Sequence, residues 1–391
     1  MVISEEIAPQ SQSGIVWAIA CYSGIASGIL MMAPSIASQV ALEWHAGPEQ
    51  IGNLFSIELG GMSLATVISW LWLSRVNWRV VAMIATTLFI IANLVSGYMP
   101  TWHSFIFLRF IASFSAGTIM IITIASGAQT KFVQKTYSYW VLSQLLLGAA
   151  GLAVLPYIFA YFNLAGCYIG LAILAFLAMP LLGNFPSTGA PTHILPISGA
   201  RQSALSFRTI LIVALPVLSV FLFYVGLSGV WTFVGTIAER AHIENSNVIF
   251  SFGTLMGVVG SAIAGFFPKS KEISILLAGY LMMAASVMLF CGVPGMTRFV
   301  AGVLIFKFAW TFVLPWILSF ISRNDHSGKL MSSINLVIGG GFAIGPFMAG
   351  KIIQAAPLNT SLLFVISSTL LVVSLVLLLG YRIFQQKQKG E

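Results

Sequence analysis

Three charged residues lie inside long apolar segments of the 391-residue chain. Arg109 lies in FIFLRFIASFSAG (105–117), Lys307 lies in IFKFAW (305–310), and Glu58 lies in a third apolar run. An ionisable side chain at the centre of a membrane helix costs at least ~2.5–3.5 kcal/mol, so such a residue is seldom incidental. The two cations could bind an anion, and the acid could carry a proton.

Each of these charges also has a structural interpretation. Arg109 could bond to carbonyl groups of a neighbouring helix or extend towards the membrane surface. Lys307 could bind a carboxylate or phosphate of a substrate, titrate itself, or form a fixed pair with Glu58. Glu58 is the only acid at membrane depth, so it is the leading candidate for a proton carrier.

Several polar and aromatic residues at membrane depth could complete a cavity around the charges. Amides in hydrocarbon more often bond between helices than bind a substrate, and both alternatives stay open. These candidates are Gln144, Asn335, Tyr22, Tyr224, Trp231 and Trp310.

The sequence contains no set of residues with the spacing of an enzyme active site. The five histidines lie in loops or at the ends of apolar runs, without the spacing of metal ligands. The phosphate-binding pattern G-x-x-x-x-G-K-[ST] is absent, which argues against ATP-driven transport. We therefore expect no enzyme activity, no cofactor and no metal site.

The composition predicts an integral membrane protein. Hydrophobic residues make up 58% of the chain and charged residues only 7%, against ~25% charged in soluble domains. The net charge of +8 comes from basic residues scattered over short loops, so we do not expect a nucleic-acid partner. The partners we expect are the lipid bilayer, a small-molecule substrate and a proton.

Twelve apolar runs are long enough to cross a hydrocarbon core of ~30 Å. They cover 14–40, 50–72, 79–98, 104–126, 137–161, 164–183, 208–235, 246–267, 273–292, 298–320, 330–354 and 360–382. The Pro-, Ser- and Gly-rich stretch 184–207 fits no such run and is typical of a linker. We predict an all-α membrane protein with six-helix bundles at 14–183 and 208–384, joined by a cytoplasmic linker.

Lysine and arginine predict the orientation of the chain. With the N-terminus inside, 13 of the 18 basic residues fall in inner loops and the tail, whereas only Arg240, Arg298 and Lys351 fall outside. This asymmetry follows the positive-inside rule and places both termini in the cytoplasm. The inner set is Arg75, Arg79, Lys131, Lys135, Arg201, Arg208, Lys269, Lys271, Arg323, Lys329, Arg382, Lys387 and Lys389.

An internal repeat relates the two halves of the chain. EQIGNLFSIE (49–58) matches ENSNVIFSFG (244–253), and QLLLG (144–148) matches NLVIG (335–339). LRF (108–110) matches FKF (306–308), which aligns one cation with the other. Parallel repeats with a substrate site at their interface are one design of secondary transporters.

With these features the chain resembles the major facilitator superfamily over essentially its whole length. The loop WLSRVNWRV keeps Arg75 and Arg79 of the family's motif after the second span, but Ser74 replaces its acidic residue. RFIASFSAG matches the fourth-span motif at Arg109 and Gly117, with Ala112 in place of the usual Gln. A Gly-Pro pair, Gly345 and Pro346, lies in the eleventh span rather than the fifth.

The resemblance implies a secondary transporter, with Arg75, Arg79, Gly117, Gly345 and Pro346 in gating motifs. Two buried cations against one acid favour an anionic or zwitterionic organic solute, moved by alternating access with protons as symporter or antiporter. An alternative is a drug or metabolite antiporter that exports lipophilic or cationic compounds. A third, of another class, is a non-transporting receptor or assembly protein. We expect a monomer in the bacterial inner membrane.

Overall fold

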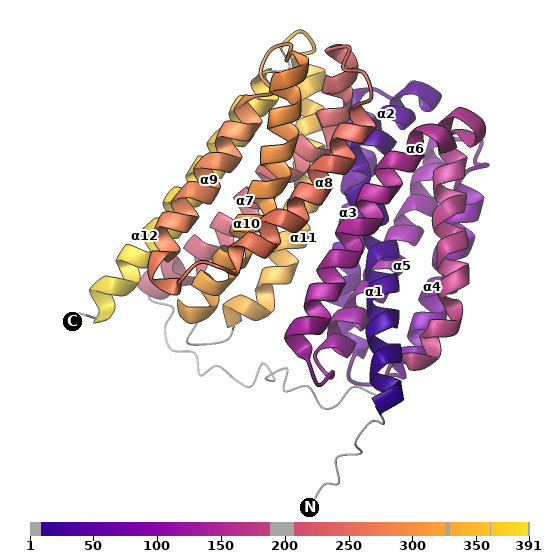
Figure 1. Ribbon diagram of the computed structural model, residues 1–391, viewed down its shortest axis with the longest axis horizontal. Helices are drawn as coiled ribbons and strands as arrows, with labels where there is room; N and C mark the ends of the chain where they lie inside the picture. Colours follow the sequence, from indigo (N-terminus) through magenta and orange to yellow (C-terminus); the bar gives the residue numbers. More distant parts are fainter. Residues whose placement is uncertain (1–8, 188–206, 325–328, 360, 390–391) are drawn as a thin grey trace, which may run out of the picture. The chain divides into compact units, whose positions relative to one another are not determined.

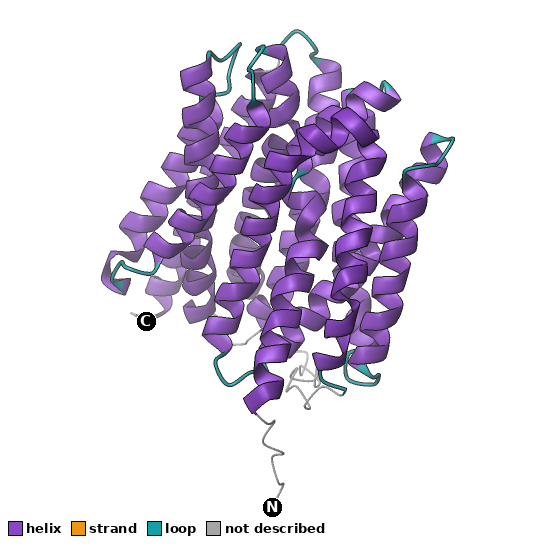
Figure 2. Cartoon of the chain, turned by 45° about the vertical axis from the view of Figure 1, so that its right-hand side comes forward, coloured by secondary structure: helices purple, strands orange, loops and turns teal. Residues whose placement is uncertain are grey.

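The computed structural model describes residues 9–187, 207–324, 329–359 and 361–389. Within these ranges the chain folds into helices joined by short loops and contains no strand (Figures 1 and 2). The prediction of an all-helical chain is therefore confirmed. The helices are α1 (Pro9–Met31), α2 (Ala33–Trp44), α3 (Pro48–Trp72), α4 (Trp78–Ser96), α5 (Trp102–Gly127), α6 (Val133–Ala178), η1 (Met179–Asn184), α7 (Phe207–Arg240), α8 (Ser246–Ala264), η2 (Lys269–Lys271), α9 (Glu272–Met288), α10 (Met296–Asn324), α11 (Lys329–Ala355) and α12 (Ser361–Lys389).

Ten helical segments of the described residues are long and apolar enough to cross a membrane, so the chain is a multi-pass membrane protein. One of them contains α6, whose 46 residues would extend about 69 Å at about 1.5 Å per residue. Asn163 interrupts α6 with φ 55° and ψ −161°, between the predicted runs 137–161 and 164–183. A further apolar helix, α9, has 17 residues. Most of the predicted linker, residues 188–206, lies outside the described residues.

A break at Met32 divides the first predicted run, 14–40, into α1 and α2. Met32 has φ −97° and ψ 8°, and Pro34 occupies the first turn of α2. Proline is favoured in a first turn because its missing N–H needs no partner there. The sequence therefore starts a new helix where a continuous one was predicted.

The chain forms two compact units that do not follow the chain order. Among the described residues, the first unit comprises 9–31, 61–151 and 157–187, and within it α5 packs on α1 and α4. The second comprises 32–60, 152–156 and the described residues from 207 to 389, and is built around α7 and α10. In the second unit α7 packs on α11, α12 and α2, and α10 packs on α8 and α9. The bundle boundaries given above, at 183 and 208, stay a prediction.

Small residues bring segment 32–60 against helices of the second unit. A Cβ on Gly52 of α3 would lie 2.5 Å from the carbonyl oxygen of Pro346 in α11, and one on Gly350 would overlap the carbonyl of Pro48. A Cβ on Gly235 of α7 would overlap the carbonyl of Pro34. Such backbone contact between helices requires residues without side chains. This packing explains why residues 32–60 belong to the second unit.

Glycine also permits close contact between α11 and α7. A Cβ on Gly345 would overlap the Ser228 hydroxyl oxygen and lie 2.6 Å from the carbonyl oxygen of Val225. The Ser228 hydroxyl donates to the carbonyl of Gly341 at 3.2 Å. The glycine-rich stretch of α11 is therefore a packing surface for α7.

Gly345→Val should lower the stability of the protein, because overpacking of a tight contact typically costs ~1–3 kcal/mol. Gly340→Ala on the same helix is the matched control, since its Cβ would meet only the Phe221 ring at 3.6 Å. Thermal unfolding of the purified proteins in detergent measures both. Equal stability of the Gly345→Val variant and the wild type would contradict this packing.

Candidate functional site

Lys307 lies in the interior of the second unit with 1% of its surface exposed. Its ammonium nitrogen is 3.8 Å from the ring centroid of Trp231 on α7 and 4.6 Å from that of Trp310 on α10. Trp310 follows Lys307 by three residues and therefore shares its helix face. We call these three residues the lysine–tryptophan cluster.

The contacts of the ammonium are aromatic. Within the described residues no carboxylate lies within 4 Å of it, so the pairing with Glu58 considered above is not formed. A cation over an aromatic face gains ~2 kcal/mol or more when desolvated, which offsets part of the cost of burial. The positive charge thus has no bound counter-charge in this part of the protein.

Further aromatic rings surround the lysine–tryptophan cluster. Phe342 of α11 lies 6.0 Å from Trp310 and 4.8 Å from Tyr224 of α7, measured between ring centroids. Phe306 is stacked on Trp231 at 6.3 Å with an interplanar angle of 11°. The structure therefore brings Lys307, Trp231, Trp310 and Tyr224 together, from helices far apart in sequence.

Glycines of α8 set the position of Lys307. A Cβ on Gly253 would lie 2.6 Å from Val303 and 3.6 Å from Cγ of Lys307. The Thr311 hydroxyl of α10 donates to the carbonyl of Gly257 at 2.7 Å. The close approach of α8 to α10 holds the lysine stem towards α7.

Arg109 lies in the first unit, on α5, and contacts residues of α4 and α6. Its Nη1 donates to Asn93 Oδ1 at 2.9 Å and to Ser96 Oγ at 3.3 Å. Its guanidinium carbon lies 4.0 Å from the ring centroid of Tyr168. Only 1% of the side chain is exposed, and these contacts favour the structural interpretation of Arg109.

The other candidates occupy separate places. Glu58 lies in α3 with 1% of its surface exposed. Gln144 donates to the carbonyl of Trp140 in its own helix at 3.3 Å. Tyr22 is fully buried, with its ring centroid 5.9 Å from that of Phe185. Asn335 belongs to α11, and its side chain lies outside the described residues.

The motif residues have local packing roles. Asn77 caps α4 by accepting from the backbone N–H groups of Arg79 and Val80 at 2.9 and 3.4 Å. Arg79 Nε donates to the carbonyl of Phe185 after η1, and Arg75 is exposed. A Cβ on Gly117 would lie 2.6 Å from the carbonyl oxygen of Met62, so Gly117 permits contact between α5 and α3.

The partners that hold the two buried cations were not predicted from the sequence. Asn93 and Tyr168 were not singled out as partners of Arg109, nor were Phe306 and Phe342 as neighbours of the tryptophans. A lone amide within an apolar run was the available signal for Asn93, because such a group needs a partner. The aromatic neighbours gave no comparable signal.

A family model of the Major Facilitator Superfamily matches residues 16–346. The chain belongs to this superfamily. This membership, with the membrane-spanning helices of the described residues, makes the chain a membrane transporter. A comparison with curated proteins finds no match.

Solved transporters share the fold over nearly the whole chain. The nucleoside transporter NupG has 15% identity and a TM-score of 0.67, with 96% of this chain and 98% of NupG covered. The POT family transporter PepTSo has 11% identity and a TM-score of 0.74, with 98% and 99% covered. The human organic anion transporter MFSD10 (TETRAN) has 16% identity and a TM-score of 0.64, with 95% and 100% covered.

Proposed function

We propose that the protein is a secondary transporter that moves a small anionic or zwitterionic organic solute through the lysine–tryptophan cluster. The observation that carries this proposal is the buried ammonium of Lys307 between the rings of Trp231 and Trp310, without a carboxylate within 4 Å in the described residues. A carboxylate or phosphate group of a solute would supply the counter-charge. The surrounding rings would contact an apolar or planar part of the same solute.

We further propose that transport is coupled to protons through Glu58. It is the acid within the apolar part of α3, and it is buried. A carboxyl group that alternates between a buried and a solvated environment takes up and releases a proton. Replacing Glu58 with Gln should abolish proton-driven uptake and retain exchange of solute for solute in proteoliposomes.

An alternative is an antiporter that exports lipophilic or cationic compounds. The aromatic rings around Lys307 favour it, since rings contact apolar compounds and cations well. Binding of its ligands should require Glu58 and should persist when Lys307 is replaced. A non-transporting receptor or assembly protein would show no solute flux at all.

The arrangement we propose has twelve crossings, cytoplasmic termini and a monomer in the inner membrane. Single cysteines at Lys387 and at Leu358, between α11 and α12, test the orientation with a membrane-impermeant thiol reagent. The proposal requires labelling of the cysteine at position 358 in intact cells. It also requires that the cysteine at 387 be labelled only after the membrane is opened.

Alternating access requires the contact between segment 32–60 and α11 to open during transport. Glu49 and Lys351, which lie 4.0 Å apart, mark this contact at an exposed position. We expect that a bis-maleimide bridge between Glu49→Cys and Lys351→Cys, with the three native cysteines replaced by alanine, reduces flux to background. Single-cysteine variants treated with the same reagent are the control, and undiminished flux in the bridged protein would contradict the mechanism.

A ligand screen by thermal shift tests the substrate class. Purified wild type, Lys307→Ala and Glu58→Gln are compared with a panel of anionic, zwitterionic, neutral and cationic solutes. Anionic or zwitterionic ligands that stabilise the wild type and not Lys307→Ala support the proposal. Cationic ligands that depend on Glu58 and still bind Lys307→Ala would overturn it in favour of the exporter.

A further inference from the structure

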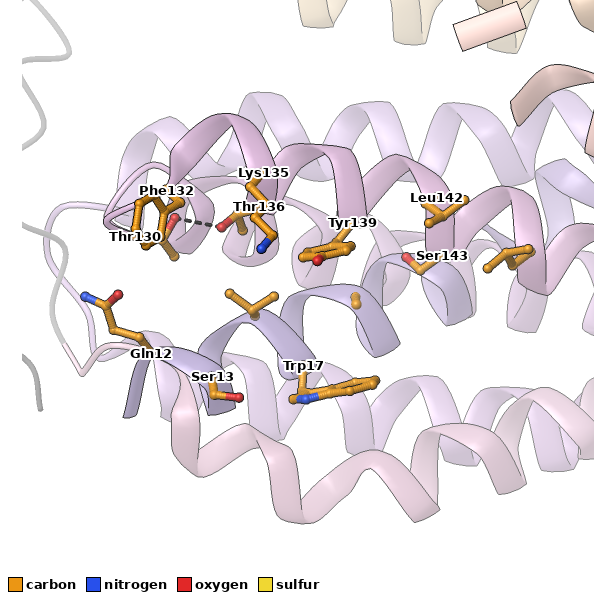
Figure 3. A pocket seen from close by; sticks show the side chains of 13 residues that line it. Gln12, Ser13, Trp17, Thr130, Phe132, Lys135, Thr136, Tyr139, Leu142 and Ser143 are labelled. Carbon is orange, nitrogen blue, oxygen red and sulfur yellow. Dashed lines mark hydrogen bonds between the residues drawn. The ribbon is translucent and has the colours of Figure 1, made fainter. Parts of the chain in front are cut away.

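A groove of about 670 Å³ lies between α1 and the start of α6, entirely within the first unit (Figure 3). The two helices meet where the hydroxyl oxygens of Ser23 and Ser143 lie 2.8 Å apart. A Cβ on Gly24 would lie 3.2 Å from the carbonyl oxygen of Ser143, so this glycine permits the contact. From there the lining extends towards Gln12 on α1 and Phe132 before α6.

Most of the polar side chains of the groove lie towards one of its ends. Thr130 and Thr136, which share a hydrogen bond of 2.9 Å, lie at the end near the start of α6, together with Lys135. Leu142 and Leu146, with Ser143 between them in sequence, line the other end. Lys135 is the charged residue among the lining residues, so the groove presents a positive charge and no negative one.

Large aromatic side chains border the polar end. Trp17 is 64% exposed and Phe132 is 71% exposed. The ammonium nitrogen of Lys135 lies 5.8 Å from the ring centroid of Tyr139. Tryptophan and tyrosine collect at the level of lipid headgroups, where one end of the side chain is apolar and the other is wet. The polar end of the groove therefore has the composition of a membrane surface.

The length of the groove agrees with one leaflet of a bilayer. From Thr136 to Leu146 the helix rises about 15 Å at about 1.5 Å per residue. This is half of a hydrocarbon core of ~30 Å. Both helices are candidate membrane spans, and the polar end of the groove coincides with their first turns.

We propose that this groove binds an anionic phospholipid, with its phosphate at Lys135 and one acyl chain along Leu142 and Leu146. Basic pockets between membrane helices are suited to anionic headgroups. A second groove, between α8 and α10, has an entirely apolar lining that includes Phe252, Met256 and Leu304. That groove offers no charge by which to select a headgroup, so we assign lipid selectivity to the α1–α6 groove alone.

Native mass spectrometry of the full chain in mild detergent tests this proposal. The probes are phosphatidylglycerol and phosphatidylcholine with identical acyl chains, and glycerol 3-phosphate as the free headgroup anion. We expect the wild type to bind phosphatidylglycerol more tightly than phosphatidylcholine. Lys135→Gln should weaken phosphatidylglycerol binding about fivefold, because a basic residue near the membrane surface contributes ~1 kcal/mol.

Lys131→Gln is the matched control, since Lys131 is an exposed lysine four residues away that does not line the groove. It should bind phosphatidylglycerol within about twofold of the wild type. Ala20→Leu, which fills the groove from α1, should weaken binding of both phospholipids. Its thermal unfolding without added lipid shows whether the variant is folded.

Three results would overturn the proposal. The first is equal binding of the two phospholipids by the wild type. The second is equal loss in Lys131→Gln and Lys135→Gln, which would assign the effect to surface charge in general. The third is tight binding of glycerol 3-phosphate that depends on Lys135, which would make the groove a site for a soluble anion.

Discussion

Replacing Lys307 with methionine is expected to lower the affinity for the transported anion by about 10- to 150-fold, because a hydrogen bond to a charged group contributes ~1.5–3 kcal/mol. Methionine keeps an unbranched apolar stem between Trp231 and Trp310, so the packing of α10 on α7 should persist. Uptake of the best ligand from the thermal-shift screen into proteoliposomes measures the loss. Binding by isothermal calorimetry separates lost affinity from lost translocation.

Lys351→Met is the matched control for this experiment. The Lys351 ammonium also lies over an aromatic ring, 4.6 Å from the centroid of Phe347. Its side chain is 54% exposed, and Glu49 lies 4.0 Å away, so its charge is solvated and paired. We expect affinity within about twofold of the wild type, since surface ion pairs contribute ~0–1 kcal/mol. A comparable loss of ligand affinity in both variants would show that Lys307 does not bind the anion directly.

The second large effect is expected from Arg109→Met, which should destabilise the protein by several kcal/mol. The substitution leaves the buried Oδ1 of Asn93 without its donor, at a cost of ~1–3 kcal/mol, and removes the contact with the Tyr168 ring. Thermal unfolding in detergent measures this loss. Arg240→Met is the control, because Arg240 is exposed and donates to the Pro357 carbonyl at 3.2 Å.

Two outcomes decide between the interpretations of Arg109. If its role is structural, Asn93→Ala and Arg109→Met should destabilise less together than the sum of their separate effects, because both remove one contact. Ligand affinity of the folded variants should then stay within about threefold of the wild type. A large loss of affinity in the milder Asn93→Ala variant, without loss of stability, would instead assign Arg109 to the solute.

Local features of the fold were predictable from the sequence. The interruption of α6 at Asn163 follows from the end of one apolar run at 161 and the start of another at 164. Asn163 takes the positive φ there, which asparagine tolerates better than most residues. The shared face of Lys307 and Trp310 follows from their spacing of three residues.

Contacts between distant helices were not predictable in the same way. The repeat aligned Arg109 with Lys307, yet Arg109 contacts α4 and α6 while Lys307 contacts α7. The offset between the repeats is 198 residues where 108–110 matches 306–308, but 195 residues where 49–58 matches 244–253. A shift of three residues turns a side chain by about 60° around a helix of 3.6 residues per turn, so an inexact repeat does not fix the face. The position of Trp231 beside Lys307 depends on the packing of α7 on α10, which no local pattern specifies.

The packing of segment 32–60 bears on how the chain is made. Gly52 contacts Gly350, and 298 residues separate them (350 − 52 = 298). At ~5–20 residues per second, about 15–60 s pass between synthesis of the two glycines. The small-residue face of α2 stays uncovered until α7 has been made, and that of α3 stays uncovered for the whole interval, until α11 has been made. The protein-conducting machinery, a chaperone or the surrounding lipid must therefore cover these faces until the last helices have been inserted.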